Sequence, residues 1–339
     1  MGKNTASPKT GKLNAALAEY DNWVRNNPDV DHIVKQKISE TLDDAGITYD
    51  QVSVRIKDRA SYIAKLRNPN YPNYEDFASA YDIVGIRVTT FHSSEIEQLL
   101  DVVSDIFTIE RVVDKAAETA NRGGFGYASQ HVIGFSETLG RSVEVQLRTV
   151  LQHAWAEFEH DVRYKNPRNA VDPEVHRAFT LAAGLIELAD EQFDKIAQIT
   201  DNELPEAENE EIETRSLPAL LNRLLGSTYP TSRADYYGWA VDMLAAHGIT
   251  TTAELAKLLS DQRLKSLTNA MNYPYKPGQV RLIDDMLLFT FGRDHIRKTV
   301  RIGENIQTRP GRLGNRWQQL GQQTYAEYQE SQDQDRNLD

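Results

Sequence analysis

The stretch from Ser142 to Arg148, SVEVQLR, limits the fold of this chain more than any other part of the sequence. Its apolar side chains alternate with an acid, an amide and a base, namely Glu144, Gln146 and Arg148. Period-two alternation predicts a β-strand with one buried face and one polar face. A solvent-facing strand would show the same pattern. The helical pattern that follows, LQHAWAEFEHDVRYK, is dense in polar and aromatic residues and favours a functional site.

A second alternating stretch, VSVRIK at residues 52–57, predicts a strand with a cationic face. Arg55 and Lys57 would lie on that face, and Lys57, Ser61 and Lys65 are spaced four apart, so they would share one side of a helix. Arginine can donate hydrogen bonds to two oxygens at once, and lysine carries a compact positive charge. These three cations and the serine hydroxyl therefore suit a polyphosphate. An ordinary cationic surface is the alternative interpretation.

The remaining periodicities predict an α+β domain followed by a smaller helical one. Helical patterns cover residues 13–25, 31–45, 58–67, 94–107, 149–163 and 174–199, and β-rich runs cover 83–91, 108–113, 128–135 and 141–148. The glycine-rich stretch 115–126 is expected to be a mobile loop. Helical patterns return from residue 216 to about residue 305.

Composition divides the chain into five expected segments. Residues 1–12 are an expected disordered lead-in, 13–200 the α+β domain, 201–215 an acidic linker, 216–320 a helical domain of unknown role, and 321–339 a disordered tail. The acidic residues after position 200 repel one another, which favours a solvated linker.

Composition also excludes several classes of function. The chain of 339 residues contains no cysteine, so it forms no disulfide, thiolate zinc site or cysteine nucleophile. Its net charge of -12 disfavours nonspecific nucleic-acid binding. No apolar run has the length of a membrane helix, and the N-terminus lacks the pattern of a signal peptide, so we expect a cytoplasmic protein.

Single residues add further candidates for a site. Asp82 stands just before the strand that contains Arg87, where a carboxylate could hold Mg²⁺ beside a nucleotide or simply form a turn. Tyr127 follows flexible glycines and could stack on a base, although a core tyrosine is the default. His153 and His160 are seven apart, too far for chelation of a metal like the four-apart zinc motif.

Five blocks in a fixed order, over residues 52 to 165, resemble the synthetase domain of the RelA/SpoT family. They read VRIKDRASYIAKL, DIVGIRV, GYASQH, VEVQLRTVLQHAWAEFEH and RYK. The likeness in layout covers roughly residues 13 to 200. It implies a nucleotidyltransferase-like fold with a mixed β-sheet flanked by helices. It also implies transfer of the β,γ-pyrophosphate of ATP to the 3′-hydroxyl of GTP, GDP or GMP, which gives the alarmones of the stringent response.

The resemblance implies roles for individual residues. For ATP they are Arg55, Lys57, Ser61, Lys65 and Arg87, with the two arginines sandwiching adenine. The residues implied to bind Mg²⁺ are Asp82 and Glu144. Glu144 is alternatively the residue that deprotonates the acceptor hydroxyl. For the acceptor they are Arg122, Tyr127, His131, Gln146, Arg148, His153 and Glu159, with Tyr127 stacking on guanine.

Departures from the family pattern concern the acceptor. The loop before Tyr127 lacks the usual Pro-Lys pair and retains Arg122, and Ala128 replaces the usual cation after the tyrosine. Short members often carry asparagine at the position of His153. The Asp31–His32 and His160–Asp161 pairs lack the companion ligands of a phosphohydrolase, so we assign no hydrolysis.

Two alternatives stay open beside a guanine-nucleotide synthetase. The same fold could act as a toxin on adenine nucleotides or tRNA 3′ ends, or it could be an inactive nucleotide-binding regulator. A basic set in the helical region keeps tRNA in view, although a solvated helix face is the simpler interpretation: Arg293, Arg297, Lys298, Arg301, Arg309, Arg312 and Arg316. As partners we expect ATP and guanine nucleotides and a second copy of the chain, with neither a membrane nor stable nucleic-acid binding.

Overall fold

The computed structural model describes residues 8–114, 129–165, 173–202 and 210–336, and it divides into two compact units. One unit comprises Met1–Thr41 and Tyr49–Phe193, and the other comprises Leu42–Thr48 and Asp194–Asp339. We call them the sheet unit and the helical unit. Among the described residues, no helix combines the length and apolar character required to cross a membrane.

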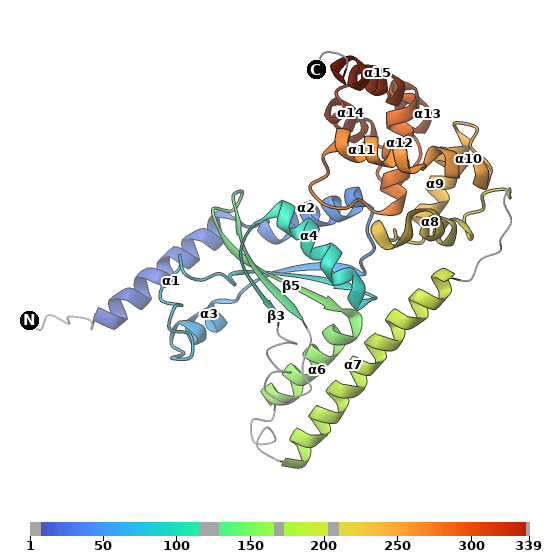
Figure 1. Ribbon diagram of the computed structural model, residues 1–339. Helices are drawn as coiled ribbons and strands as arrows, with labels where there is room; N and C mark the ends of the chain where they lie inside the picture. The colour runs from blue at the N-terminus through green and yellow to red at the C-terminus, as the bar shows by residue number, and fades with distance from the viewer. Residues whose placement is uncertain (1–7, 115–128, 166–172, 203–209, 337–339) are drawn as a thin grey trace, which may run out of the picture. The chain divides into compact units, whose positions relative to one another are not determined.

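The sheet unit contains a mixed five-stranded sheet with helices on both faces (Figure 1). Its elements, in chain order, are α1 (Pro8–Asn26), α2 (Val30–Ala45), β1 (Gln51–Ile56), α3 (Arg59–Leu66), β2 (Val84–Thr90), the 3₁₀ turn η1 (Ser93–Glu95), α4 (Ile96–Ile106), β3 (Thr108–Asp114), β4 (Gln130–Ser136), β5 (Arg141–Thr149), α6 (Val150–Lys165) and α7 (Pro173–Asn202). The last residues of α2 and α7, from Leu42 and from Asp194 onward, belong to the helical unit. The strand order is β1-β2-β5-β4-β3. Only the pairing of β2 with β5 is parallel among these neighbours. The expected α+β class with a mixed sheet is therefore confirmed.

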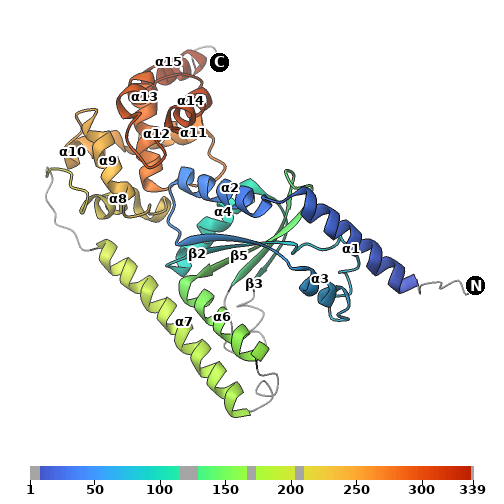
Figure 2. The ribbon, with the colours of Figure 1, turned by 180° about the vertical axis from the view of Figure 1, so that it is seen from behind.

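The two faces of the sheet differ in character because apolar and polar residues alternate along its strands. The apolar face carries Val88, Val145 and Val132, all buried, and α4 covers it. A Cβ added to Gly134 on this face would lie 2.9 Å from Cβ of Phe107, the residue that ends α4. Helix α6 lies on the opposite, polar side of the sheet (Figures 1 and 2).

An aromatic cluster holds α1, α3 and the segment before β2 together. Tyr20 of α1 stacks on the fully buried Tyr62 of α3 at 5.2 Å between ring centroids, and Tyr62 meets Tyr74 edge-on at 6.0 Å. The guanidinium of Arg141 lies 4.2 Å from the Phe77 ring centroid. Burial of these large rings is the main stabilising contribution in this part of the unit, and it fixes the segment that leads to Asp82.

The helical unit is built from short helices around a leucine-rich core. They are α8 (Leu217–Leu225), the 3₁₀ turn η3 (Gly226–Thr228), α9 (Tyr236–Ala245), α10 (Thr252–Leu258), α11 (Asp261–Met271), α12 (Gln279–Phe291), α13 (Arg293–Thr299), α14 (Arg309–Gln319) and α15 (Tyr325–Arg336). Helix α12 is the central one, since ten of its thirteen residues are buried.

The segment Leu42–Thr48 folds as part of the helical unit, which the sequence did not predict. Leu42, Ala45 and Ile47 are at most 1% exposed. The amide of Gly278 donates to the carbonyl of Ala45 at 2.7 Å, and a Cβ at Gly278 would lie 2.0 Å from the Gly46 oxygen. Position 278 therefore requires glycine because two backbones touch there.

Both ends of the chain and the linker differ from the expected segments. Helix α1 begins at Pro8, inside the expected lead-in. The expected disordered tail contains α15, because Tyr325 and Tyr328 meet Phe289 edge-on at 5.7 and 5.6 Å. In the expected linker, Ile212 is buried and its amide donates to Thr250 at 2.8 Å. Hydrophobic anchors within polar stretches explain these differences.

Candidate active site

The polar side chains of β1, β2 and β5 lie on one face of the sheet, in rows set by the strand register. Arg55, Gly85 and Glu144 form one row, because Gly85 pairs with each of the other two residues. Arg87 and Gln146 pair in the next row. Residues that pair directly across strands present their side chains on the same face. The alternation noted in the sequence thus produces a single surface of arginines and an acid.

Gly85 lies in the middle of this surface, and the side chain of Arg55 packs against it. A Cβ at residue 85 would lie 3.4 Å from both Cγ and Nε of Arg55. The Arg55 side chain therefore lies over β2 at Gly85, the residue that pairs with Glu144 on the next strand. The backbone at Gly85 does not require glycine, because its φ is not positive. Room for the Arg55 side chain is therefore the physical effect of this residue.

Glu144 lies within a short chain of polar contacts on the polar face. Its carboxylate accepts a hydrogen bond from Nε2 of Gln146 at 3.1 Å and lies 3.2 Å from Nδ1 of His131. Burial alone would raise the pKa of Glu144, but the hydrogen bond and charge of His131 lower it below its ordinary value. Glu144 is therefore ionised at neutral pH. The other ring nitrogen of His131 is buried and has no hydrogen-bond partner among the described residues.

Asp82 is held by two lysines and a tyrosine. Its Oδ2 lies 2.6 Å from Nζ of Lys65 and 3.1 Å from Nζ of Lys57, and its Oδ1 accepts a hydrogen bond from the Tyr74 hydroxyl at 2.6 Å. Burial opposes ionisation, but the bonds from Lys65 and Tyr74 and the lysine charges lower the pKa of Asp82. Its charge also acts on the pKa of Glu144, which it raises. The two predicted carboxylates therefore lie within electrostatic reach of each other.

The structure brings Lys57 and Lys65 together, whereas Ser61 has a different local role. Ser61 is exposed near the start of α3, and its backbone amide donates to the N-cap side chain of Asp58 at 2.9 Å. Lys65 is surrounded by the rings of Tyr71, Tyr74 and Tyr81, each 4.6 to 4.7 Å from its nitrogen. Cation–π contacts and the ion pair fix this lysine beside Asp82.

Three arginines create an excess of positive charge on the polar face. Arg148 is 4% exposed, and its pKa is lowered to about 9 by burial and by repulsion from Arg87 and Arg55. Arg87 has an ion pair with Glu157 at 3.1 Å, while its buried Nε has no hydrogen-bond partner among the described residues. Buried donors without partners are rare in proteins. An anionic ligand on this face would accept hydrogen bonds from such donors.

Helix α6 begins with a capping box and then supplies two groups to the site. Thr149 accepts from the Gln152 amide at 3.1 Å, and the Gln152 side chain accepts from the Thr149 amide at 2.9 Å. Burial and the charge of Arg87 lower the pKa of His153. Glu157, one turn further, was not predicted, although its spacing of four from His153 was a usable signal. Glu159 is half-buried on the same helix.

The remaining predicted acceptor residues, Arg122 and Tyr127, lie outside the described residues, as does the predicted loop 115–126. Among the described residues, no three acidic or histidine side chains form a metal-binding group. Magnesium commonly takes one or two carboxylates and completes its shell with water and substrate phosphates. Asp82 and Glu144 fit that donor set only together with a phosphate ligand.

The predicted solvated basic face in the helical unit is wrong at two positions. Arg309 and Arg316 are 7% and 6% exposed and pair with aspartates. Arg297, by contrast, has a side chain that is 77% exposed and pairs with Asp294 at 3.0 Å. A continuous cationic surface for tRNA therefore does not include the two buried arginines.

Comparison with known proteins places the site in a family. Residues 54–169 match the model of the region found in RelA / SpoT proteins. The chain therefore carries a RelA/SpoT-family domain, and the resemblance stated from the sequence is confirmed.

A curated relative is the GTP pyrophosphokinase YjbM of Bacillus subtilis (strain 168), 28% identical over 130 residues. That match covers 35% of this chain and 58% of the relative, so the chain spans less than two thirds of its length. Small alarmone synthetase 1 from Bacillus subtilis is 21% identical, with a TM-score of 0.46, over 55% of this chain and 100% of that one. The same enzyme bound to its product pppGpp gives 22% identity and a TM-score of 0.46, over 54% and 98%.

Proposed function

We propose that this protein transfers the β,γ-pyrophosphate of ATP to the 3′-hydroxyl of a guanine nucleotide and releases AMP. One observation carries the proposal: the ionised Glu144 and the arginines of three neighbouring strands share one face of a RelA/SpoT domain. A surplus of arginine beside a fixed carboxylate suits a polyphosphate substrate with a hydroxyl to activate. The match to a GTP pyrophosphokinase supports the choice of acceptor.

We assign the ATP side of the site to β1, α3 and β2. Arg55 and Arg87 would enclose the adenine ring, and Gly85 leaves room for the Arg55 side chain over β2. Lys57 and Lys65 would bind phosphate oxygens, and Ser61 lies at the exposed start of α3 near them. Asp82 forms ion pairs with both lysines, so phosphate binding would redistribute these pairs.

Asp82 and Glu144 would hold Mg²⁺ together with the donor phosphates. Bound there, the ion would neutralise charge on the transferred group and on the leaving phosphate. Both carboxylates have lowered pKa values and are ionised at neutral pH, as metal ligands must be. Both carboxylates therefore carry the negative charge that a ligand of Mg²⁺ requires.

The transfer is an in-line substitution at the β-phosphorus of ATP. The acceptor 3′-oxygen forms a bond to this phosphorus, and the bond between the phosphorus and the oxygen bridging to the α-phosphate breaks. AMP leaves with that electron pair. In this proposal Glu144 would take the hydroxyl proton, and His131, in contact with it at 3.2 Å, would hold its orientation. The arginine and lysine charges stabilise the negative charge that develops on AMP.

The acceptor side is assigned to the remaining predicted residues. Gln146 and Arg148 lie next to Glu144 on β5, His131 lies beside it on β4, and His153 and Glu159 come from α6. Tyr127 and Arg122 precede β4 in the chain and would bind the guanine and its 5′-phosphates. The unpaired Nε2 of His131 offers a hydrogen-bonding group for the acceptor.

The test is to incubate the full chain and Mg²⁺ with labelled ATP and each of GTP, GDP and GMP, and to resolve AMP and the labelled products. We expect AMP and a 3′-pyrophosphorylated guanine nucleotide in equal amounts. Glu144→Gln should abolish both, while Glu137→Gln in an exposed turn should not.

Parallel incubations with ADP, AMP and tRNA separate the alternatives. Label transferred to one of these acceptors and to no guanine nucleotide would contradict the proposed acceptor and favour the toxin function. Absence of AMP release with every acceptor, despite nucleotide binding, would favour an inactive regulator.

A further inference from the structure

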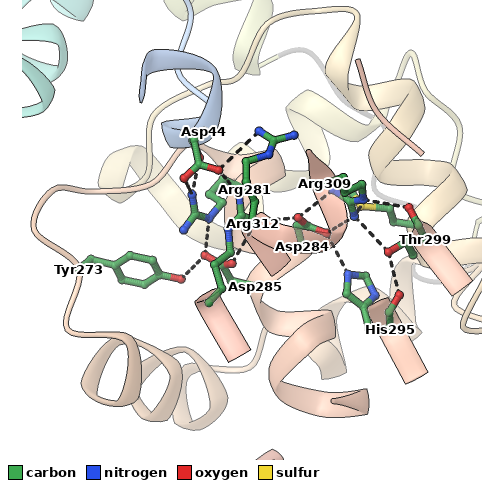
Figure 3. A network of polar contacts seen from close by, with 11 residues as sticks. Asp44, Tyr273, Arg281, Asp284, Asp285, His295, Thr299, Arg309 and Arg312 are labelled. Carbon is green, nitrogen blue, oxygen red and sulfur yellow. Dashed lines mark hydrogen bonds and ion pairs between the residues drawn. The ribbon is translucent and has the colours of Figure 1, made fainter. Parts of the chain in front are cut away.

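The helical unit contains a pocket that the proposed transfer does not use. Its walls come from the segment Leu42–Thr48, α9, α12, the residues 302–305 and α14, and its empty volume is about 550 Å³, part of it open to solvent. Four arginines line it, namely Arg281, Arg309, Arg312 and Arg316. Figure 3 shows three of them, Arg281, Arg309 and Arg312, together with Asp44 and Asp284.

Three of these arginines are tied to buried aspartates at short distance. Arg309 lies 2.6 Å from Asp284, and Arg281 lies 2.6 Å from Asp285. Arg316 joins Asp44 and also lies 2.8 Å from Asp284. Each of these three aspartates therefore forms an ion pair with at least one arginine at short distance, which compensates its charge inside the protein.

Arg312 is the fourth cation beside these three acids. Its ion pair is a 3.6 Å contact to Asp44, whose oxygens are already engaged by Arg281 and Arg316. Its Nε is buried without a hydrogen-bond partner among the described residues, while 32% of its side chain is exposed. Burial lowers the pKa of Arg312, and the charges of Arg316 and Arg309 act in the same direction. The Arg312 guanidinium thus lines the pocket and has N–H groups available to bind a ligand.

The other walls limit what could pair with Arg312. Tyr236 and Trp239 stack on each other at 4.8 Å and form an aromatic wall. Asp43 and Glu304 also line the pocket, and both accept from the Tyr236 hydroxyl, at 3.1 and 3.5 Å. These carboxylates would repel a polyphosphate, so a single oxyanion group fits better than a triphosphate.

We propose that Arg312 binds one oxyanion group of a small metabolite, a phosphate ester or free phosphate, in this pocket of the helical unit. The planar guanidinium would present two N–H groups to two ligand oxygens. The site is separate from the synthetase residues assigned above, and the proposal does not depend on the identity of the transfer reaction.

The test uses the full chain carrying Arg55→Ala and Arg87→Ala, so that nucleotide binding on the sheet is weakened. This protein is titrated with inorganic phosphate, AMP and ATP, and binding is followed by calorimetry. We expect saturable binding of AMP or phosphate that is weakened at least about tenfold by Arg312→Gln, the loss of one charge-assisted contact. ATP should bind this pocket more weakly than AMP. The matched control is Arg297→Gln, an exposed arginine of the same unit.

Several outcomes are decisive. Tighter binding of AMP than of phosphate identifies a nucleotide as the source of the oxyanion, and equal binding identifies free phosphate; both support the site. Unchanged affinity in Arg312→Gln, or no saturable binding of either probe at millimolar concentration, overturns it. If Arg312→Gln fails to fold by circular dichroism, Arg312→Lys keeps the charge but loses the fork, and an unchanged affinity there also contradicts the proposal.

Discussion

Arginines meet carboxylates in two parts of this chain, and the two groups differ in how completely their charges are paired. On the polar face of the sheet, Arg87 and His131 each retain a buried nitrogen without a partner among the described residues. In the helical unit, Asp284 is bound by His295 at 2.9 Å and by two arginines, and all four side chains are nearly buried. The first group is arranged for a ligand and the second mainly for the fold.

This difference shows why residue type alone does not identify a site. Both groups contain arginine and acid, and both disturb pKa values through burial. A network of paired charges stabilises one arrangement of helices. Hydrogen-bond donors without a partner on an open face can instead bind a ligand. Arg312 differs from the other three arginines of the pocket because its ion pair, to Asp44, is 3.6 Å long, which is why we assign a ligand to it. The following predictions separate the two kinds of group by measuring stability and activity together.

The largest effect on stability is expected from Asp284→Asn. The substitution keeps the size of the side chain but leaves Arg309 and Arg316 without their shared charge partner in a buried site. We expect a loss of about 3–5 kcal/mol in the free energy of unfolding of the helical unit. Hydrogen exchange of the α12 amides measures this unit directly.

Asp294→Asn is the matched control, because Asp294 pairs with Arg297 and Lys298 on the surface of the same unit. Its exchange rates should stay close to those of the wild type. Equal behaviour of the two variants would contradict the distinction between a fold-stabilising network and a surface pair.

Glu144→Gln should have the largest effect on activity. The amide cannot accept the hydroxyl proton and binds a cation poorly, so we expect AMP release to fall by at least about 100-fold. Labelled-ATP turnover at saturating substrate measures it, and the unfolding midpoint of the sheet unit should change little. A variant that retains more than a tenth of the wild-type rate would remove Glu144 from the chemistry.

A smaller effect on activity is expected from Gly85→Val. Valine suits a strand, and the backbone at residue 85 accepts a side chain, so stability should be kept or increased. Its side chain would occupy the space beside Arg55. We expect kcat/KM for ATP to fall by about tenfold through displacement of the donor. Steady-state kinetics at several ATP concentrations test this, and wild-type kinetics would show that the packing of Arg55 against Gly85 has no function.

The smallest effect concerns mild acid. Burial opposes ionisation of Asp44 and Asp284, but their arginine partners lower both pKa values far below the ordinary value of 3.8. Their stabilisation is complete above the unfolded pKa and is lost as the pH falls through 3.8 toward the folded values. At pH 3.8 the two groups together lose roughly 0.8 kcal/mol. Hydrogen exchange of α12 between pH 6 and 3.5 measures the slope, and Asp284→Asn should have a shallower one.

Much of the sheet unit could be predicted from local patterns. The alternation at residues 52–57 and 142–148 predicted which face of each strand would be polar, and the structure places Arg55 and Glu144 in one row through Gly85. Periodicity could not predict the hydrogen bond from Tyr74 to Asp82, eight residues later, because that contact depends on packing within the aromatic cluster. Glu157 was missed for a similar reason, since its ion pair with Arg87 requires α6 to cross the sheet.

The helical unit was predicted less well. Its leucine spacing indicated helices, but Arg309 and Arg316 looked like solvated residues because their acidic partners are remote in the sequence. Asp44 is 272 residues from Arg316. Tyr325 and Tyr328 stand in a polar tail, and their burial follows from contact with Phe289, which lies about 40 residues earlier in the chain.

The sequence alone determined the β periodicity, the order of the RelA/SpoT blocks and the residue types that can handle phosphate, because each depends on neighbours within one strand or helix. Only the tertiary structure decided which charges are paired. Burial and long-range contacts assign Leu42–Thr48 to the helical unit, pair Arg281, Arg309 and Arg316 with aspartates, and leave Arg312 and the polar face of the sheet with unused donors. Pairing is a property of three-dimensional distance, which local periodicity does not encode.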